Sequence, residues 1–276
     1  WENSLDARAV PALADHVVGG SVVFPGAGFV EMAIAAAGEW RGEGADACLD
    51  LEDLEIHAPL LFVPGHSATV RLAVDGADGG FAIRARGQGA ADAWQLHATG
   101  RILAAPREAP HFAQAFEPPA REPDFDAATH LALAHRAGLD YGPAFQAVAH
   151  GWVGDGEVLA RFAPPADAPA AIAHVARLDG AFQLLVHLMK DESAARPGVA
   201  FVPVRAGRLQ VAKERAPPAF ARTRIVRRAP RSLTAEISLF DESGRRVAWL
   251  RGVRFRSVPL RKPAVERLHF LAEVAV

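Results

Sequence analysis

The pattern of hydrophobic and polar residues predicts a helix followed by several strands in the first half of the chain. Residues 25–40 carry apolar side chains at the spacing of one helix face, namely Phe29, Met32, Ala33, Ala36 and Trp40. Apolar and polar residues then alternate as in half-buried strands, over residues 68–74, 80–86 and 94–102. Strands that follow one another without intervening helices indicate an antiparallel sheet rather than βαβ units.

The second half repeats this order of elements. A helix is predicted over residues 179–190, surrounded by strands at 157–162, 201–211, 221–228, 233–240 and 245–258. A shorter helix over residues 126–137 should begin at Asp126 as its N-cap and end at Gly138. No glycine-rich phosphate loop follows a predicted strand, so a nucleotide-binding fold is not indicated. The predicted fold class is α+β.

A proline-rich segment divides the two halves. Residues 104–123 follow neither the helical nor the strand period, so we expect an extended linker there. The resulting division is a first unit over residues 1–103, a linker over 104–125, a second unit over 126–260, and the start of a further linker over 261–276.

Composition narrows the class of protein. Half of the 276 residues are hydrophobic, and 30 Lys and Arg against 32 Asp and Glu give a net charge of −2, which does not favour nucleic acid as a partner. The single cysteine, Cys48, excludes a disulfide framework within the chain and fits the reducing cytoplasm. No apolar run of about 18 residues and no signal peptide are present, so we expect no membrane association. Because the chain begins with Trp1, we expect it to be part of a longer polypeptide.

Three short segments carry candidate chemistry. His16 precedes the pair Gly19-Gly20, which can adopt positive φ or allow close backbone approach, although a buried structural histidine is the alternative. Asp179 precedes an apolar helix, where an N-cap is the ordinary role, but Gln183 on the same helix face could orient its carboxyl group. Residues 141–145, which contain a Gly-Pro pair, could form no more than a tight turn.

Taken together, these segments resemble the dehydratase domains of modular type I polyketide synthases. Residues 16–25 match the HxxxGxxxxP motif of that family, residues 141–145 its YGPxF motif, and residues 179–183 its DxxxQ/H motif. The three motifs occur in the family's order and with its wide separations, so the resemblance covers essentially the whole chain. The matching residues are His16, Gly20, Pro25, Tyr141, Gly142, Pro143, Phe145, Asp179 and Gln183.

The chain departs from the family pattern in two places. Val175 follows His174 where the family often has proline, and residues 201–204 (FVPV) stand in place of an LPF-like segment. Neither departure affects the three motifs, but the shape of the substrate tunnel is not predicted.

The resemblance implies a double hotdog fold, in which two antiparallel sheets, over residues 1–103 and 126–260, each wrap a central helix. It also implies that a 3-hydroxyacyl thioester loses water, with His16 as the base that takes the Cα proton. Asp179, kept protonated in an apolar tunnel, is the implied acid that donates to the leaving hydroxyl. The other motif residues bind substrate or support the pair, and N–H groups near residues 26–28 polarise the thioester carbonyl.

The same resemblance implies the partners and leaves alternatives open. The substrate should arrive on the phosphopantetheine of an acyl carrier protein, with no bound cofactor and no metal, in a homodimer with neighbouring synthase domains. The arginines of residues 222–231 either dock this carrier or form a solvated strand face. Relatives with the same motifs also cyclise a hydroxyl onto the new double bond to form a pyran, or epimerise an α-methyl centre. A non-catalytic structural domain is a further alternative, which intact His16 and Asp179 argue against.

Overall fold

A twelve-stranded antiparallel sheet runs through the molecule. The structure is a computed structural model that describes residues 1–42, 48–63, 65–87, 93–106, 112, 116–164, 169–191, 198–213 and 217–260. Five neighbouring strands come from the first half, in the order β1 (Glu2–Leu5), β5 (Ala68–Val74), β6 (Gly80–Arg86), β7 (Gln95–Ile102) and β4 (Cys48–Ile56). The sheet continues with β12 (Val199–Ala212), β15 (Arg246–Pro259), β14 (Ser232–Phe240), β13 (Phe220–Ala229), β11 (Glu157–Phe162), β10 (Val148–Val153) and β8 (Phe125–Asp126).

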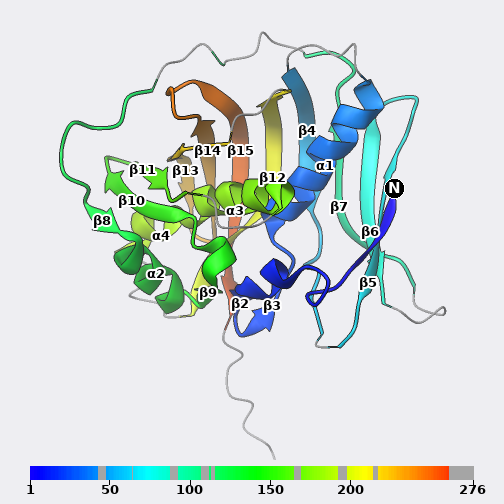
Figure 1. Ribbon diagram of the computed structural model, residues 1–276, viewed down its shortest axis with the longest axis horizontal. Coiled ribbons are helices and arrows are strands. Elements are labelled where there is room, and N and C mark those ends of the chain that lie inside the picture. The colour runs from blue at the N-terminus through cyan, green and yellow to red at the C-terminus, as the bar shows by residue number, and fades with distance from the viewer. Residues whose placement is uncertain are drawn as a thin grey trace, which may run out of the picture.

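Each half of the sheet holds one long helix. Helix α1 (Gly26–Arg41) contacts β4, β5 and β7, and α3 (Ala170–Gln183) contacts β13 and β14. The two helices lie on the same side of the sheet and touch each other (Figure 1). Of the residues predicted for the inner face of α1, the side chains of Phe29, Ala33 and Ala36 are buried, whereas Met32 and Trp40 are half-buried. Pro25, with φ −63°, immediately precedes the helix. These features confirm the α+β class and the double hotdog arrangement.

The two halves are joined edge to edge into one sheet, rather than packed as two separate sheets. Strands β4 and β12 pair antiparallel from Cys48↔Ala212 to Glu55↔Arg205, which covers an edge that each half would otherwise expose. Sequence patterns did not predict β4, because Asp50 is acidic yet fully buried. Its carboxylate accepts hydrogen bonds from Arg208 Nη2 at 2.6 Å and Gln210 Nε2 at 3.2 Å, so its burial is compensated across the junction.

The predicted helix over residues 179–190 is wrong at its start. Helix α3 begins at Ala170, directly after Pro169, and ends at Gln183; a short helix, α4 (Leu185–Leu188), follows. Asp179 therefore lies in the third turn of α3 and is not an N-cap. Gly180 allows α3 to approach the sheet, since a Cβ atom there would lie 3.0 Å from Phe162 Cε1.

A small three-stranded sheet links the two halves beside α3. Its strands are β3 (Ser21–Val22), β2 (His16–Val18) and β9 (Leu139–Tyr141), with β2 in the centre. Gly19 and Gly20, with φ of 59° and 79°, form the two-residue turn between β2 and β3. Both residues at the centre of such a turn need positive φ, which explains the glycine pair. Two short 3₁₀ helices, η1 (Pro11–Asp15) and η2 (Pro143–Phe145), flank this sheet.

Helix α2 (Ala127–Arg136) has the ends that the sequence predicts. Asp126 Oδ1 accepts a hydrogen bond from the Thr129 N–H at 2.8 Å, and Gly138, with φ 83°, follows the last turn. In the described part of the chain, no helix is both long and apolar enough to cross a membrane.

The linker predictions are only partly covered by the structure. Residues 107–111, 113–115 and 261–276 lie outside the described residues. Within the predicted linker, the Phe116 N–H donates to the Gly244 carbonyl at 2.9 Å, and Phe116 stacks on Phe240. Phe125 already belongs to β8. The division into domains stays a prediction.

Candidate active site

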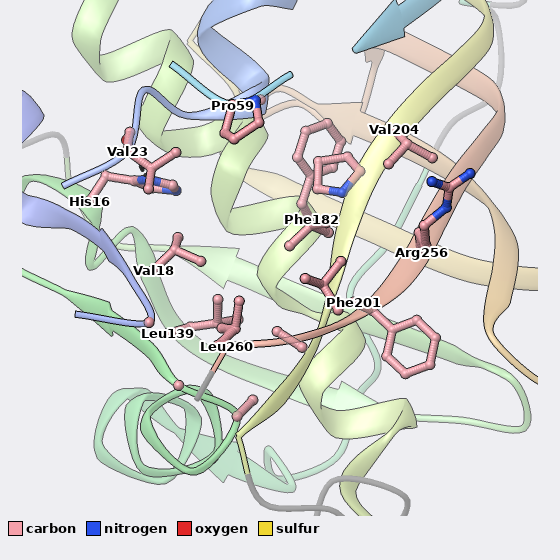
Figure 2. A pocket seen from close by; sticks show the side chains of 18 of the residues that line it. His16, Val18, Val23, Pro59, Leu139, Phe182, Phe201, Val204, Arg256 and Leu260 are labelled. Carbon is pink, nitrogen blue, oxygen red and sulfur yellow. Dashed lines mark hydrogen bonds between the residues drawn. The ribbon is translucent and has the colours of Figure 1, made fainter. Parts of the chain in front are cut away.

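A large cavity lies where the two halves meet. Its volume is about 1500 Å³, and its walls come from β2, β3 and the end of β4 in the first half and from β9, α3, α4, β12 and β15 in the second. Figure 2 shows His16 and Val23 on one side, Phe201 and Arg256 on the opposite side, and Phe182 between them. The cavity is therefore bounded by segments far apart in the sequence.

The structure brings His16 and Asp179 together at the wall of this cavity. His16 Nε2 lies 3.6 Å from Asp179 Oδ1, and the two residues are 6% and 5% exposed. His16 Nδ1 lies 2.8 Å from the Val23 carbonyl oxygen, which can only accept a hydrogen bond. The proton of a neutral His16 therefore stays on Nδ1, and Nε2 presents its lone pair.

The charge of Asp179 changes the proton affinity of His16. Burial by itself lowers the pKa of the imidazole, but the Asp179 carboxylate, together with hydrogen bonds to Asp179 and Val23, outweighs burial. The net result is a raised pKa for His16. An imidazolium formed at this position is stabilised by the neighbouring carboxylate.

The YGPxF segment holds two aromatic rings against His16. Tyr141 pairs with His16 in the small sheet, and its ring centroid lies 5.6 Å from the imidazole; the Phe145 ring lies 5.1 Å away, edge-on. Phe145 is fully buried. Burial, reinforced by the charges of Asp179 and Asp140, raises the pKa of the Tyr141 phenol well above its usual value. Tyr141 therefore lines the cavity as a neutral hydroxyl group.

Gly142 is explained by its contact with Asp15, a residue that no sequence motif singles out. The Asp15 carbonyl accepts the Gly142 N–H at 2.8 Å, and Asp15 Oδ2 accepts the Ala144 N–H at 2.8 Å. A Cβ atom at position 142 would overlap the Asp15 carboxyl group, so this close approach requires glycine. Pro143 opens η2. The only sequence signal for Asp15 is its place directly before His16.

Gln183 contacts Asp179 as its spacing predicted. Its Nε2 donates to Asp179 Oδ2 at 2.9 Å and to the Phe145 carbonyl at 3.2 Å. On the other side, Gln183 Oε1 lies 3.1 Å from Nε2 of His130, a buried residue of α2. The sequence carries no signal for His130, because a helical pattern does not distinguish a packing histidine from one that contacts the site.

The remaining motif residues have supporting positions. Gly20 lines the cavity and forms the turn after β2, whereas Pro25 precedes α1 and is not part of the lining. N–H groups of residues 26–28 were expected to face a thioester. The N–H of Gly28 is not available for this role, because it donates to the Pro25 carbonyl at 2.8 Å. Gly26 lines the cavity, and a Cβ atom there would lie 2.9 Å from Pro203 Cγ.

The two departures from the family pattern lie in different places. Residues 201–204 all line the cavity, and Pro203 lies at an irregularity in the pairing of β12 with β15, where a missing N–H is tolerated. These residues therefore contribute directly to the shape of the cavity. His174 Nδ1 lies 3.8 Å from Glu31 Oε1, which links α3 to α1. Among the described residues, no group of three or more His, Cys, Asp or Glu side chains is arranged to hold a metal ion.

Comparisons with known sequences agree with this geometry. A family model described as "Polyketide synthase dehydratase N-terminal domain" matches residues 113–264, and one described as "Polyketide synthase dehydratase domain" matches residues 1–87. Polyketide synthase GfsB of Streptomyces halstedii is 34% identical over 244 residues, which is 85% of this chain. Polyketide synthase GfsE of the same organism is 38% identical over 188 residues, or 64% of this chain. The chain spans only 4% and 5% of these two relatives.

Solved structures show the same fold. The dehydratase domain from the CurJ module of curacin polyketide synthase superposes with a TM-score of 0.77 at 23% identity, covering 94% of this chain and 91% of that one. The dehydratase domain of PpsC from Mycobacterium tuberculosis, solved in complex with C12:1-CoA, gives a TM-score of 0.72 at 25% identity, covering 94% and 93%.

Proposed function

The chain belongs to the polyketide synthase dehydratase family, and we propose that it is a hydro-lyase acting on a 3-hydroxyacyl thioester carried by an acyl carrier protein. The product is the 2,3-enoyl thioester, formed during polyketide chain elongation. The observation that carries this proposal is the 3.6 Å approach of His16 Nε2 to Asp179 Oδ1 at the cavity wall.

The reaction follows from the two facing groups. The thioester acidifies the Cα–H bond, and the lone pair of His16 Nε2 takes that proton as a general base. The electrons of the broken C–H bond form the Cα–Cβ double bond, and the Cβ–O bond breaks. Asp179 gives its proton to the departing hydroxyl, which leaves as water. After this step His16 is an imidazolium and Asp179 is a carboxylate.

The short distance between His16 and Asp179 also allows the proton to return after each turnover. The proton on His16 Nε2 lies next to Asp179 Oδ1, so its return to the carboxylate regenerates the neutral base and the acid together. Both groups are buried, which keeps their proton exchange with solvent low. The cycle consists of proton transfers that these two side chains supply, and the proposal includes no bound cofactor and no metal.

The walls of the cavity fit a substrate with an apolar chain and a charged carrier arm. Leu139, Val186 and Ala200 belong to a second apolar cluster beside the cavity and offer a surface for the acyl chain. Arg254 and Arg256 are exposed on β15 and also line the cavity, so they present positive charge to the phosphate of a phosphopantetheine arm. A homodimer with neighbouring synthase domains remains part of the proposal, by analogy with the longer relatives.

Product analysis tests the proposed reaction. The purified chain is incubated with a 3-hydroxyacyl pantetheine thioester and with the same acyl group on a carrier protein, and the products are identified by mass spectrometry and by the ultraviolet absorbance of the enoyl thioester. We expect the enoyl thioester with loss of one water. A cyclic ether, an epimerised hydroxyacyl chain or unchanged substrate with a folded chain would contradict the proposal.

A further inference from the structure

A chain of buried hydrogen bonds continues behind Asp179, away from the cavity. It begins with the Gln183 amide, whose orientation is fixed because the Phe145 carbonyl can only accept a hydrogen bond. The Gln183 atom that faces this carbonyl must therefore be Nε2, which also donates to Asp179 Oδ2. Oε1 then points the other way, toward His130 Nε2 at 3.1 Å.

This orientation defines the tautomer of His130. Because Gln183 Oε1 accepts, His130 Nε2 carries a hydrogen and donates it. The other ring nitrogen, Nδ1, lies 3.0 Å from Nε2 of His187 on α4. Burial lowers the pKa of His130, although its bond to Gln183 works in the opposite direction. Burial, with the charges of His130 and Lys190, lowers the pKa of His187 to about 3. Both rings are therefore neutral, and His187 Nε2 donates to His130 Nδ1.

All the hydrogens in this chain point the same way. His187 donates to His130, His130 to Gln183, and Gln183 to Asp179 Oδ2. The two histidines and Gln183 are at most 5% exposed, so water does not compete for these bonds. Phe125 of β8 stacks on His187, with ring centroids 3.7 Å apart, and on His130 at 6.1 Å. The chain is thus held by α2, α3, α4 and β8 together.

The arrangement determines which oxygen of Asp179 carries the acid proton. Oδ2 already accepts the Gln183 hydrogen, so a proton on the carboxyl group belongs on Oδ1, the oxygen that lies 3.6 Å from His16 Nε2. We propose that His130 is a positioning residue, which holds the Gln183 amide so that the transferable proton of Asp179 faces His16 and the substrate. This inference rests on the proposed function, because it concerns the same acid.

Steady-state kinetics of three variants test the positioning role of His130. His130→Phe keeps an aromatic ring beside the stacked rings of Phe125 and His187 but removes the donor, leaving Gln183 Oε1 unsatisfied. We expect kcat to fall about 10- to 100-fold, part of the about 10²–10⁴-fold that general acid–base catalysis contributes, with KM changed less than about twofold. His130→Gln places an amide N–H near the former Nε2 and should restore most of kcat.

The control is His97→Phe, which removes another buried histidine. His97 contacts Phe29 and the Ala58 carbonyl instead of Gln183, so kcat of this variant should be unchanged.

Nitrogen-15 spectroscopy of the histidine rings gives a readout that does not depend on turnover. In the wild type, His130 should show a protonated Nε2 and an unprotonated, hydrogen-bonded Nδ1. His187→Phe removes the donor to Nδ1 and should shift the Nδ1 signal without unfolding the chain. Unchanged kcat in His130→Phe, equal losses in His130→Phe and His130→Gln, or an Nδ1-protonated His130 would each overturn the inference. If the wild type forms no enoyl thioester, the proposed function fails, whereas the ring spectra still decide whether the hydrogen-bond chain exists.

Discussion

His16 Nε2 and Asp179 Oδ1 lie 3.6 Å apart although 163 residues separate them in the chain. His16 reaches this place on β2, in the centre of a sheet that contains β9 of the second half. Asp179 reaches it from the third turn of α3. Neither half contains the pair by itself, so the candidate site exists only when both halves are folded and joined.

Replacement of Asp179 by Asn should abolish most of the dehydration. The amide keeps the shape and still contacts Gln183, but it has no acidic proton, so we expect kcat to fall by about 10²–10⁴-fold. Because Asp179 is inside α3 and is not an N-cap, the melting temperature should not fall at a pH above the raised pKa of His16, where the His16–Asp179 pair makes no charge contribution to the fold. Steady-state kinetics and thermal unfolding of Asp179→Asn measure both quantities. Near-normal turnover would show that Asp179 is not the acid.

The same variant should lower the pKa of His16. While Asp179 is ionised, as it is after it has given its proton to the leaving hydroxyl, its carboxylate outweighs burial and raises the pKa of His16 above 6.5. This ionised pair stabilises the fold below pH 6.5, and the contribution is lost as pH rises through the raised pKa. Without the carboxylate, burial dominates. NMR titration of the His16 ring, identified by its absence in His16→Phe, measures the change. An unchanged or higher pKa in Asp179→Asn would contradict the electrostatic coupling.

The buried histidines should make the fold sensitive to mild acid. Burial lowers the pKa values of His97, His130 and His187, the last to about 3. Between pH 6.5 and these folded values, the unfolded chain binds protons that the folded chain does not, so stability falls as pH falls. Each such histidine contributes a slope of about 1.4 kcal/mol per pH unit.

Urea unfolding at several values between pH 6.5 and 4.5 measures this slope. The window lies above the range in which Asp124 and Asp126 titrate, since hydrogen bonds lower the pKa values of both carboxyl groups. His187→Phe should reduce the slope by about 1.4 kcal/mol per pH unit. A slope identical to that of the wild type would mean that His187 is protonated equally in both states.

Gly142→Ala should disturb both stability and turnover. The new Cβ atom would meet the Asp15 carboxyl group, which is held by the Ala144 N–H, so η2 must shift and carry Phe145 away from His16. Overpacking of this kind costs about 1–3 kcal/mol. Thermal unfolding and kcat measure the effect.

Gly38→Ala is the matched control for that variant. Gly38 lies in α1, and a Cβ atom there would contact nothing within 4 Å. Alanine is the better helix former by about 1 kcal/mol, so this variant should be slightly more stable with unchanged kcat. Equal behaviour of the two alanine variants would argue against the role of the Asp15 contact.

Of the arginines on β13, Arg227 is the one suited to testing carrier docking. It is exposed, whereas Arg228 donates to the Leu188 carbonyl at 3.2 Å beside Met189, a residue of the cavity wall. If the strand docks an acidic carrier, Arg227→Glu should lower kcat/KM about two- to fivefold for carrier-bound substrate. The pantetheine thioester should be unaffected, and raised salt should imitate the variant. Equal losses with both substrates would place docking elsewhere.

Local sequence determined the elements whose signals lie within a few residues. The apolar spacing of α1, the Asp126 cap of α2 and the Gly19-Gly20 turn all appear where the chain predicts them, because each depends on φ, on hydrogen bonds to nearby N–H groups, or on one helix face. The three motifs also identified His16, Asp179 and Gln183 before their geometry was known.

Only the tertiary structure decided the features that depend on partners distant in sequence. Strand β4 was missed because the burial of Asp50 is made favourable by Arg208, which lies 158 residues later. The N-terminus of α3 was misplaced because Asp179, which has the chemistry of a cap, lies in the helix interior, where it contacts Gln183 of the same helix and His16 of β2. His130 carries no local signal, since its role depends on an amide 53 residues away whose orientation is set by a main-chain carbonyl. Buried polar groups must find partners wherever the fold provides them, and sequence periodicity does not encode those partners.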